Sequence, residues 1–240
     1  MGFITRYWWF TEVENQGRRG EFVVSDEDLR VESEDCEAPL VIENGWRVRS
    51  LVQREEEMRS VADVQAEAFY SPMAFFNGFF FEIFKAEVLA GLLYRIRNSA
   101  PNRYACLVAE TDNKPESQAV TYPRIIGVVD VTVLRDDSVL QFLDDADEYL
   151  YVSGIAVLTA FRRRKVATVL LKACDLVAML WKFDYLVLRA YEDDVGARKL
   201  YSTAGYRVVA KDPLWMTSWI GRRRRVLMIK KTPPDQELNP

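Results

Sequence analysis

Hydrophobic residues recur along the chain with two periods, one typical of strands and the other typical of helices. Apolar and polar positions alternate over residues 46–53, which predicts a half-buried strand. Apolar residues three to four positions apart predict a helix over residues 54–68 and a second, aromatic-rich helix over residues 73–97. Further strands are predicted over residues 104–110, 125–134, 149–158, 185–191, 206–210 and 226–231.

Two more helices are predicted between the later strands, over residues 163–181 and 194–204. The resulting order of strands and helices predicts an α/β sandwich, in which helices flank a mixed sheet. We therefore expect one domain over residues 45–232. It is preceded by an acidic extension, residues 1–44, and followed by a short tail, residues 233–240.

The composition excludes several classes of function. The 240-residue chain has 49% hydrophobic and 28% charged residues, a net charge of −4 and no histidine. Without histidine there is no His-based catalytic triad and no His-ligated metal, so we expect no metal cofactor. The acidic balance disfavours nucleic-acid binding, and no uncharged stretch is long enough for membrane insertion. The three cysteines, Cys36, Cys106 and Cys174, show no CxxC spacing and predict no disulfide framework.

Four consecutive basic residues, Arg162, Arg163, Arg164 and Lys165, open the predicted helix over residues 163–181. Cations at a helix N-terminus face the positive end of the helix dipole, which costs about 0.3–1 kcal/mol each. A bound polyanion would compensate, because helix N-terminal N–H groups and arginine side chains both bind phosphate groups. The alternative is a basic turn that is merely solvated.

The basic run follows the predicted strand over residues 149–158 and precedes the predicted helix over residues 194–204, which contains the motif Ala-x-x-Leu-Tyr from Ala197 to Tyr201. In this order the three features resemble the GNAT superfamily of acetyl-CoA-dependent N-acetyltransferases, whose pyrophosphate loop reads (Q/R)-x-x-G-x-(G/A). Arg162 and Ala167 match its first and last positions, and Lys165 replaces its central glycine. The resemblance implies the GNAT fold, an α/β fold in which two neighbouring parallel strands of a mixed central sheet splay apart.

The resemblance also implies where the co-substrate acetyl-CoA binds. In this family the pantetheine arm lies between the splayed strands, here along the backbone of Ile155, Ala156 and Val157. The diphosphate binds in the pyrophosphate loop, which here consists of Arg162, Arg163, Arg164, Lys165, Val166 and Ala167. Asp194 falls where many members carry an asparagine beside the coenzyme, and the cap of a helix is its alternative role.

Two tyrosines are implied for catalysis. Tyr201 matches the family's proton donor near the coenzyme sulfur, and a phenol with a pKa of about 10 stays protonated at neutral pH. A backbone N–H group, that of Ile155 or Ala156, stabilises the oxyanion. Tyr151 stands where histone-type relatives carry a glutamate and N-terminal acetyltransferases carry a tyrosine, so we expect it to act as the base through a water molecule.

The base determines which amine reacts most easily. Arg189 stands where the N-terminal acetyltransferases carry the histidine that works with their tyrosine. Glu148 and Glu110 are alternative bases. A weak base favours an α-amine, because a lysine side chain costs roughly 3 kcal/mol more to deprotonate.

Three segments are similar to the plant plastid GNATs, a group that acetylates both protein N-termini and lysine side chains: residues 69–72, 73–97 and 161–167. The likeness implies protein or peptide substrates with free amines, and a chloroplast location with the cytoplasm as the alternative. Two other functions stay open, namely acetylation of a small amine such as a polyamine, and non-catalytic binding of acyl-CoA by a regulator. The presence of Tyr201 favours an enzyme.

Overall fold

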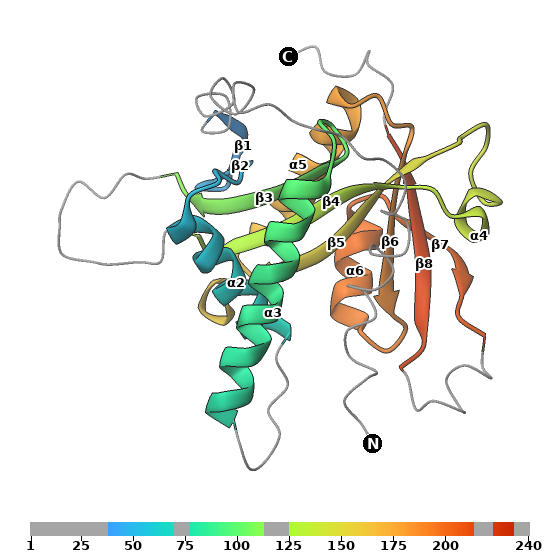
Figure 1. Cartoon of the computed structure of the whole chain (residues 1–240). Helices are drawn as coiled ribbons and strands as arrows, with labels where there is room; N and C mark the ends of the chain where they lie inside the picture. Colours follow the sequence, from blue (N-terminus) through green and yellow to red (C-terminus); the bar gives the residue numbers. More distant parts are fainter. Residues whose placement is uncertain (1–37, 70–76, 113–124, 214–222, 233–240) are drawn as a thin grey trace.

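The computed structural model describes residues 38–69, 77–112, 125–213 and 223–232, without the side chains of residues 77–80. Its strands form one eight-stranded sheet in the order β1-β2-β3-β4-β5-β6-β8-β7 (Figure 1). All neighbouring strands are antiparallel except β5 and β6, which are parallel. The strands are β1 (Pro39–Glu43), β2 (Trp46–Ser50), β3 (Tyr104–Thr111), β4 (Gly127–Leu134), β5 (Tyr149–Val157), β6 (Tyr185–Tyr191), β7 (Arg207–Lys211) and β8 (Arg225–Lys231).

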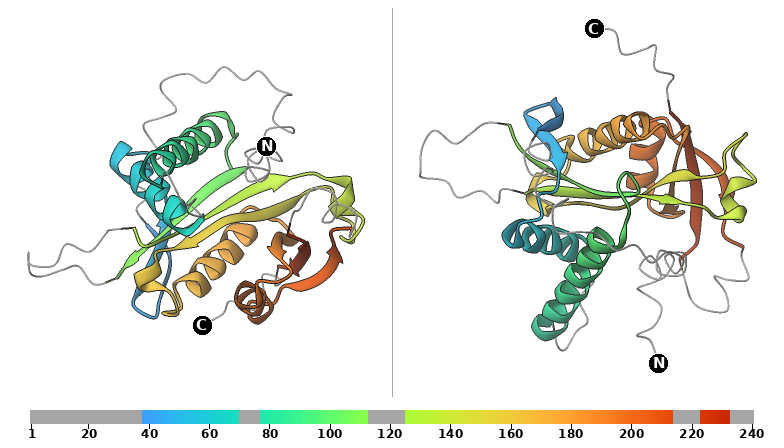
Figure 2. Two further views of the ribbon diagram at one scale, coloured as in Figure 1. Left: turned by 90° about the horizontal axis from the view of Figure 1, so that it is seen from below. Right: turned by 45° about the horizontal axis from the view of Figure 1, so that its top comes forward.

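Helices cover both faces of the sheet. Figure 2 shows α2 and α3 on one face, and α5 and α6 on the other. The helices are α2 (Glu55–Phe69), α3 (Asn77–Asn98), α4 (Asp137–Leu140), α5 (Val166–Leu180) and α6 (Val195–Thr203), with a 3-10 turn, η2 (Thr159–Phe161). This mixed α/β architecture confirms the predicted fold class.

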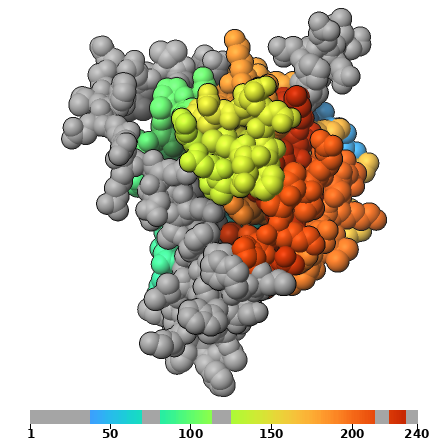
Figure 3. Space-filling model, turned by 90° about the vertical axis from the view of Figure 1, so that its right-hand side faces the viewer, coloured from blue at the N-terminus to red at the C-terminus, as the bar shows by residue number. Residues whose placement is uncertain are grey.

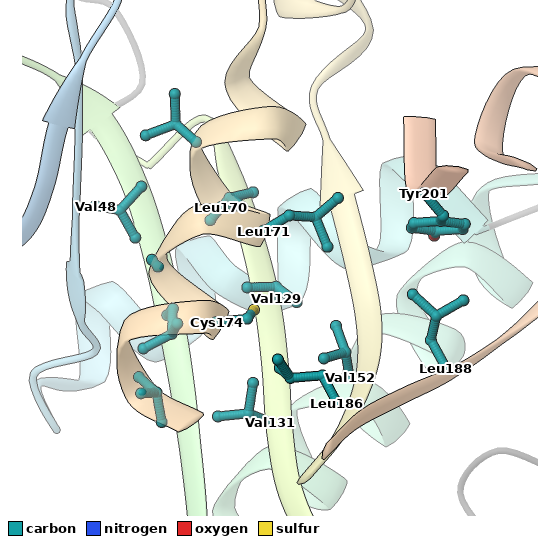
Figure 4. Close-up of a cluster of buried hydrophobic side chains, with 14 of the residues drawn as sticks. Val48, Val129, Val131, Val152, Leu170, Leu171, Cys174, Leu186, Leu188 and Tyr201 are labelled. Carbon is teal, nitrogen blue, oxygen red and sulfur yellow. The ribbon is translucent and has the colours of Figure 1, made fainter. Parts of the chain in front are cut away.

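A large hydrophobic core lies between α5 and the sheet (Figure 4). Val169, Leu170 and Cys174 occur at helical spacing on α5, and each is 0% exposed. They pack with residues of the sheet such as Val129 and Leu186. Full burial of one such side chain is worth about 1.5–3 kcal/mol. This core holds α5, and therefore its N-terminus, firmly against the sheet.

The sheet begins at β1, inside the segment that is expected to be an extension. β1 and β2 form an antiparallel hairpin in which Glu43 pairs with Trp46. The turn residues Asn44 and Gly45 have φ values of 55° and 78°, the left-handed conformation that Asn-Gly turns favour. The Asn-Gly pair was therefore the signal for this hairpin. The rest of the expected extension, residues 1–37, and the tail, residues 233–240, lie outside the described residues.

Two further differences concern helices. The expected helix over residues 163–181 begins only at Val166, because Arg163 and Lys165 have φ values of 64° and 66°, which are not helical. The second difference is the short helix α4 in the acidic segment before β5, where the sequence predicts no helix; Asp136 caps its first turn. The first of these differences shapes the candidate site.

Candidate active site

The sheet opens between β5 and β6. The two strands pair at only two positions, Leu150 with Leu186 and Tyr151 with Val187. Beyond Tyr151, β5 continues to pair with β4, whereas β6 continues to pair with β8. The edge of β5 that faces β6 is consequently open from Val152 to Val157. This is the splay that the resemblance implied.

A β-bulge shapes the open part of β5. The pairing with β4 shifts between Val128 and Asp130, so that Gly154 and Ile155 together oppose the single residue Val129. Gly154 has a φ of 61°, and a Cβ atom there would lie 2.7 Å from Asp130 Oδ2. Only glycine fits this position, because both the backbone conformation and the close approach exclude a side chain.

The bulge is followed by a stretch whose polar groups alternate between β4 and the opening. The N–H group of Leu158 donates to the carbonyl oxygen of Ile126 at 2.9 Å, so it points toward β4. Alternation along an extended strand then directs the N–H groups of Val157 and Ile155 toward the opening, and that of Ala156 toward β4. Ile155 and Val157 are the residues of this stretch that can bind a ligand through the backbone.

The basic run forms a tight turn between η2 and α5. Arg163 and Lys165 both have left-handed φ values, which cost residues with a Cβ atom roughly 1–2 kcal/mol each. Lys165 thus adopts the conformation that the family's central glycine supplies. Within the described residues, the N-cap residue Lys165 makes no side-chain capping bond to α5, and the side chains of the basic run are exposed. Open N–H groups beside exposed cations suit a phosphate-bearing coenzyme.

Two contacts tie this turn to the neighbouring strands. Arg162 Nε donates to the carbonyl oxygen of Val157 at 3.2 Å, which joins the turn to the open edge of β5. Trp46 Nε1 donates to the carbonyl oxygen of Arg164 at 2.7 Å. Trp46 was not predicted to belong to the site, and no local sequence signal could have found it, because 118 positions separate the two residues.

Tyr201 lies on the other side of the opening, on α6. Its side chain is 7% exposed and belongs to the same buried cluster as Leu188 of β6 (Figure 4). Its ring packs edge-on against Tyr206, with 6.2 Å between the ring centroids. Burial raises the pKa of the Tyr201 phenol above its ordinary value, and Asp194 and Tyr151 raise it further. The two tyrosines predicted for catalysis are therefore close enough to interact electrostatically.

Asp194 takes its alternative role. Its carboxylate caps α6 by accepting a hydrogen bond from the N–H group of Ala197 at 2.9 Å. The side chain is exposed at the N-terminus of the helix that carries Tyr201. Asp194 thus stabilises the first turn of α6, and this role is compatible with a nearby coenzyme.

The alternative bases are held in ion pairs. Glu148 accepts two hydrogen bonds of 2.6 Å from Arg103, which lower the pKa of its carboxyl group. Glu110 is 7% exposed and lies 3.3 Å from the buried Arg49. Arg189 pairs with Asp212 at 3.4 Å. A carboxylate with a lowered pKa is a weaker base, which favours Tyr151 over Glu148. The carboxylate of Glu110 is occupied by its ion pair with Arg49.

A pocket of about 140 Å³ opens elsewhere, between the segment after α4 and the C-terminal strands. Figure 3 shows the yellow-green α4 segment lying against these orange and red strands. None of the predicted site residues lines this pocket. In the described ranges no three His, Cys, Asp or Glu residues are grouped so that they could hold a metal ion. The described helices include none with the length and apolar character that a membrane span requires.

The open β5 edge, the basic turn and the α6 tyrosine agree with the comparison with known protein families. The acetyltransferase (GNAT) family model matches residues 61–206. The chain belongs to this family. It is a GNAT-type N-acetyltransferase that uses acetyl-CoA.

A plant relative narrows the family further. The chain is 55% identical over 193 residues to the chloroplastic GCN5-related N-acetyltransferase 10 of Arabidopsis thaliana, an alignment that covers 80% of this chain and 75% of that protein. The resemblance to the plant plastid GNATs is thereby confirmed, as is the chloroplast location that it implied.

Solved structures support the fold of this GNAT protein. The ribosomal-protein-S18-alanine N-acetyltransferase of Escherichia coli aligns with a TM-score of 0.51 and 14% identity, over 81% of this chain and 99% of that one. A chimera of the spermidine N-acetyltransferase of Vibrio cholerae aligns with a TM-score of 0.51 and 14% identity, over 78% of this chain and 96% of that one. Since one of these names a protein substrate and the other a small amine, the fold does not distinguish the two classes.

Proposed function

We propose that this GNAT enzyme acetylates the α-amines of protein N-termini and, more slowly, the ε-amines of lysine, by direct transfer in a ternary complex. The observation that carries the proposal is the residue at the narrow end of the β5–β6 opening. This residue is Tyr151, the last residue of β5 that pairs with β6. Efficient acetylation of lysine would need a strong carboxylate base at this position, and a tyrosine is a weaker base. The 55% identical chloroplastic relative and the segments shared with plant plastid GNATs support the same function.

Acetyl-CoA fits the residues on both sides of the opening. Its diphosphate would lie against the N-terminus of α5 and the exposed cations of residues 162–165, and its pantetheine amides would pair with the backbone of Ile155 and Val157. Bound in this way, the coenzyme supplies an activated acetyl thioester at the level of Tyr151 and Tyr201. Asp194 caps α6, the helix that carries Tyr201.

Tyr201 donates a hydrogen bond to the departing sulfur. Burial keeps its phenol protonated at neutral pH. A phenol whose pKa exceeds 10 is a weaker acid than a thiol near 8.5, so complete proton transfer to a thiolate is uphill by at least about 2 kcal/mol. Tyr201 therefore acts as a hydrogen-bond donor whose proton moves to the sulfur only as the carbon–sulfur bond breaks.

Residues of β5 stabilise the oxyanion and help to remove the proton from the amine. Of the two N–H groups considered, that of Ile155 faces the opening, so we assign the stabilisation of the developing oxyanion to Ile155 rather than Ala156. Tyr151 orients the water molecule that accepts the proton from the amine. A site with such a weak base prefers an amine that is already neutral, which at pH near 8 is an α-amine and not a lysine side chain.

The decisive experiment compares three kinds of acceptor with acetyl-CoA and the whole protein. They are lysine-free peptides with a free N-terminus, N-terminally blocked peptides with one lysine, and spermidine, with products identified by mass spectrometry. At pH 7.5 we expect kcat/KM for the α-amine to exceed that for lysine by roughly 200-fold, following the fraction of neutral amine. The advantage should shrink as the pH rises. A higher kcat/KM for spermidine than for both peptides would establish the small-amine alternative, and coenzyme binding without any turnover would establish the regulator.

A further inference from the structure

The indole of Trp46 holds the basic turn from inside the protein. Trp46 begins β2 and is 8% exposed. Its Nε1 donates to the carbonyl oxygen of Arg164 at 2.7 Å, and its ring meets Phe161 edge-on, with 6.0 Å between the centroids and 81° between the planes. Phe161 belongs to η2, immediately before the turn. Trp46 therefore contacts the turn through one specific hydrogen bond and one aromatic contact.

This hydrogen bond determines which way the neighbouring N–H group points. The peptide bond between Arg164 and Lys165 is trans and planar, so its carbonyl and N–H groups point in opposite directions. With the carbonyl of Arg164 directed inward to Trp46, the N–H group of Lys165 is directed outward, on the side of the exposed turn. There it lies next to the first N–H groups of α5, to which the N-cap residue Lys165 makes no side-chain capping bond in the described part of the chain.

The backbone on both sides has the form that binds anions. Arg163 and Lys165 are both left-handed, with φ values of 64° and 66°. Left-handed residues next to a right-handed helix turn successive N–H groups toward one point, a concavity that binds phosphate groups. Two side chains of the turn, although exposed, also contact neighbouring residues. Lys165 Nζ donates to Asn44 Oδ1 at 3.3 Å, and the Arg164 guanidinium lies 5.6 Å from the centroid of the Phe161 ring.

We propose that Trp46 is a positioning residue of the coenzyme site. It orients the peptide between Arg164 and Lys165 so that the turn presents its N–H groups to the diphosphate, and it thereby replaces the conformational freedom that a central glycine would provide at Lys165. The inference rests on the assignment of this turn to the diphosphate. It assigns to β2, a strand remote from the opening, a part in binding the coenzyme.

The first test is the affinity for coenzyme A measured by calorimetry. Trp46→Phe keeps the aromatic contact with Phe161 and removes only the indole N–H group. We expect Kd to rise about tenfold, which corresponds to about 1.4 kcal/mol. Trp181→Phe is the matched control, because Trp181 stands at the opposite end of α5 and partly packs against the same core. Its Kd should stay within twofold of the unaltered value. Equal Kd values for the unaltered protein and Trp46→Phe would overturn the proposal.

The second test locates the effect on the diphosphate. The ratio of kcat/KM for acetyl-CoA to kcat/KM for S-acetylpantetheine, which lacks the nucleotide diphosphate, cancels any change in the folded fraction. This ratio should fall about tenfold in Trp46→Phe and stay constant in Trp181→Phe. An equal loss with both donors would give Trp46 a merely structural role. A ratio near one in the unaltered protein would instead refute the assignment of the turn to the diphosphate.

A third measurement needs no variant. By nuclear magnetic resonance, the indole N–H proton of Trp46, assigned through its contacts with Phe161, should exchange slowly with solvent both with and without coenzyme A. The amide protons of Lys165 and Val166 should become protected only when coenzyme A is bound. Rapid exchange of the indole proton in both states would contradict the proposal even if Trp46→Phe failed to fold.

Discussion

Two tyrosines, the partly buried Tyr104 on β3 and the buried Tyr201 on α6, show how the surroundings of the same side chain differ between the interior of the protein and the candidate site. Burial is the main cause that raises the pKa of both phenols. Tyr104 donates a hydrogen bond of 2.6 Å to Asp130, a carboxylate that is 0% exposed. Tyr201 lies beside the β5–β6 opening, where Asp194 and Tyr151 raise the pKa of its phenol but do not accept its proton. A raised pKa therefore indicates burial, and the neighbours decide whether the proton is available.

The surroundings of Tyr104 form a closed polar network behind the bulge of β5. Asp130 also accepts hydrogen bonds from Gln65 Nε2 at 3.0 Å and from the 5%-exposed Arg95 at 3.4 Å. These partners come from α2 and α3, so the network joins both helices to the sheet. Gly154 lies directly against it. The network thus supports the shape of β5 but offers no free proton to a substrate.

The largest effect is expected on stability when the network loses the carboxylate of Asp130. Asp130→Ala leaves the buried guanidinium of Arg95 without this carboxylate and should lower the free energy of unfolding by about 3–5 kcal/mol. Urea denaturation measures the change. Asp63→Ala is the matched control, because the pair of Asp63 with Lys85 is largely exposed and is worth about 1 kcal/mol or less. A loss below 1 kcal/mol in Asp130→Ala would show that the network does not hold the helices to the sheet.

The second largest effect is expected for kcat when Tyr201 is replaced. Tyr201→Phe should lower kcat about 100-fold, because the departing sulfur loses its hydrogen-bond donor, while Kd for coenzyme A and the free energy of unfolding change little. Tyr206→Phe is the control in the adjacent ring. The described structure records no hydrogen-bond partner for the buried Tyr206 hydroxyl, so its removal should leave kcat within about threefold and should not destabilise the protein. Equal kcat values for Tyr201→Phe and the unaltered enzyme would remove Tyr201 from the mechanism.

Tyr104→Phe should have a smaller effect than Tyr201→Phe, and the effect should be on stability and not on kcat. Removal of a hydrogen bond to a buried carboxylate should lower the free energy of unfolding by about 2 kcal/mol. The kcat of the folded enzyme should be unchanged, because the phenol lies outside the opening. Thermal unfolding and steady-state kinetics on the same preparation separate the two quantities. If kcat fell as far as it does in Tyr201→Phe, the contrast between the two regions would be wrong.

The smallest effect is one on the pH profile. The rate with an α-amine peptide should rise as the amine loses its proton, with a midpoint near pH 8. A raised pKa means that Tyr201 keeps its proton to higher pH, so the alkaline fall should begin only above about pH 10. We expect kcat/KM at pH 9 and pH 10 to agree within about twofold. A fall below pH 9.5 that disappears in Tyr201→Phe would mean that the site lowers the pKa instead.

Local patterns in the sequence were sufficient for most of the fold. The apolar runs of β3, β4, β5 and β6 and the helical period of α5 marked these elements, because an element must bury its apolar residues whatever it packs against. Residues 162–167 and the helix that contains Tyr201 marked the candidate coenzyme site, since phosphate binding places a loop and a helix N-terminus next to each other in the chain. The hairpin at Asn44 and Gly45 could also have been predicted from the Asn-Gly pair, although the acidic residues around it obscured the strand pattern.

Contacts between distant segments were decided only by the tertiary structure. The short pairing of β5 with β6, the bond from Trp46 to Arg164, and the ion pairs that occupy Glu148 and Glu110 each join residues far apart in the chain. No local pattern records such a partner, because desolvation and electrostatic interaction depend on what folding brings nearby. The chain by itself determined which residues could do the chemistry. The fold decided which of them keep a proton, a charge or an N–H group free to do it.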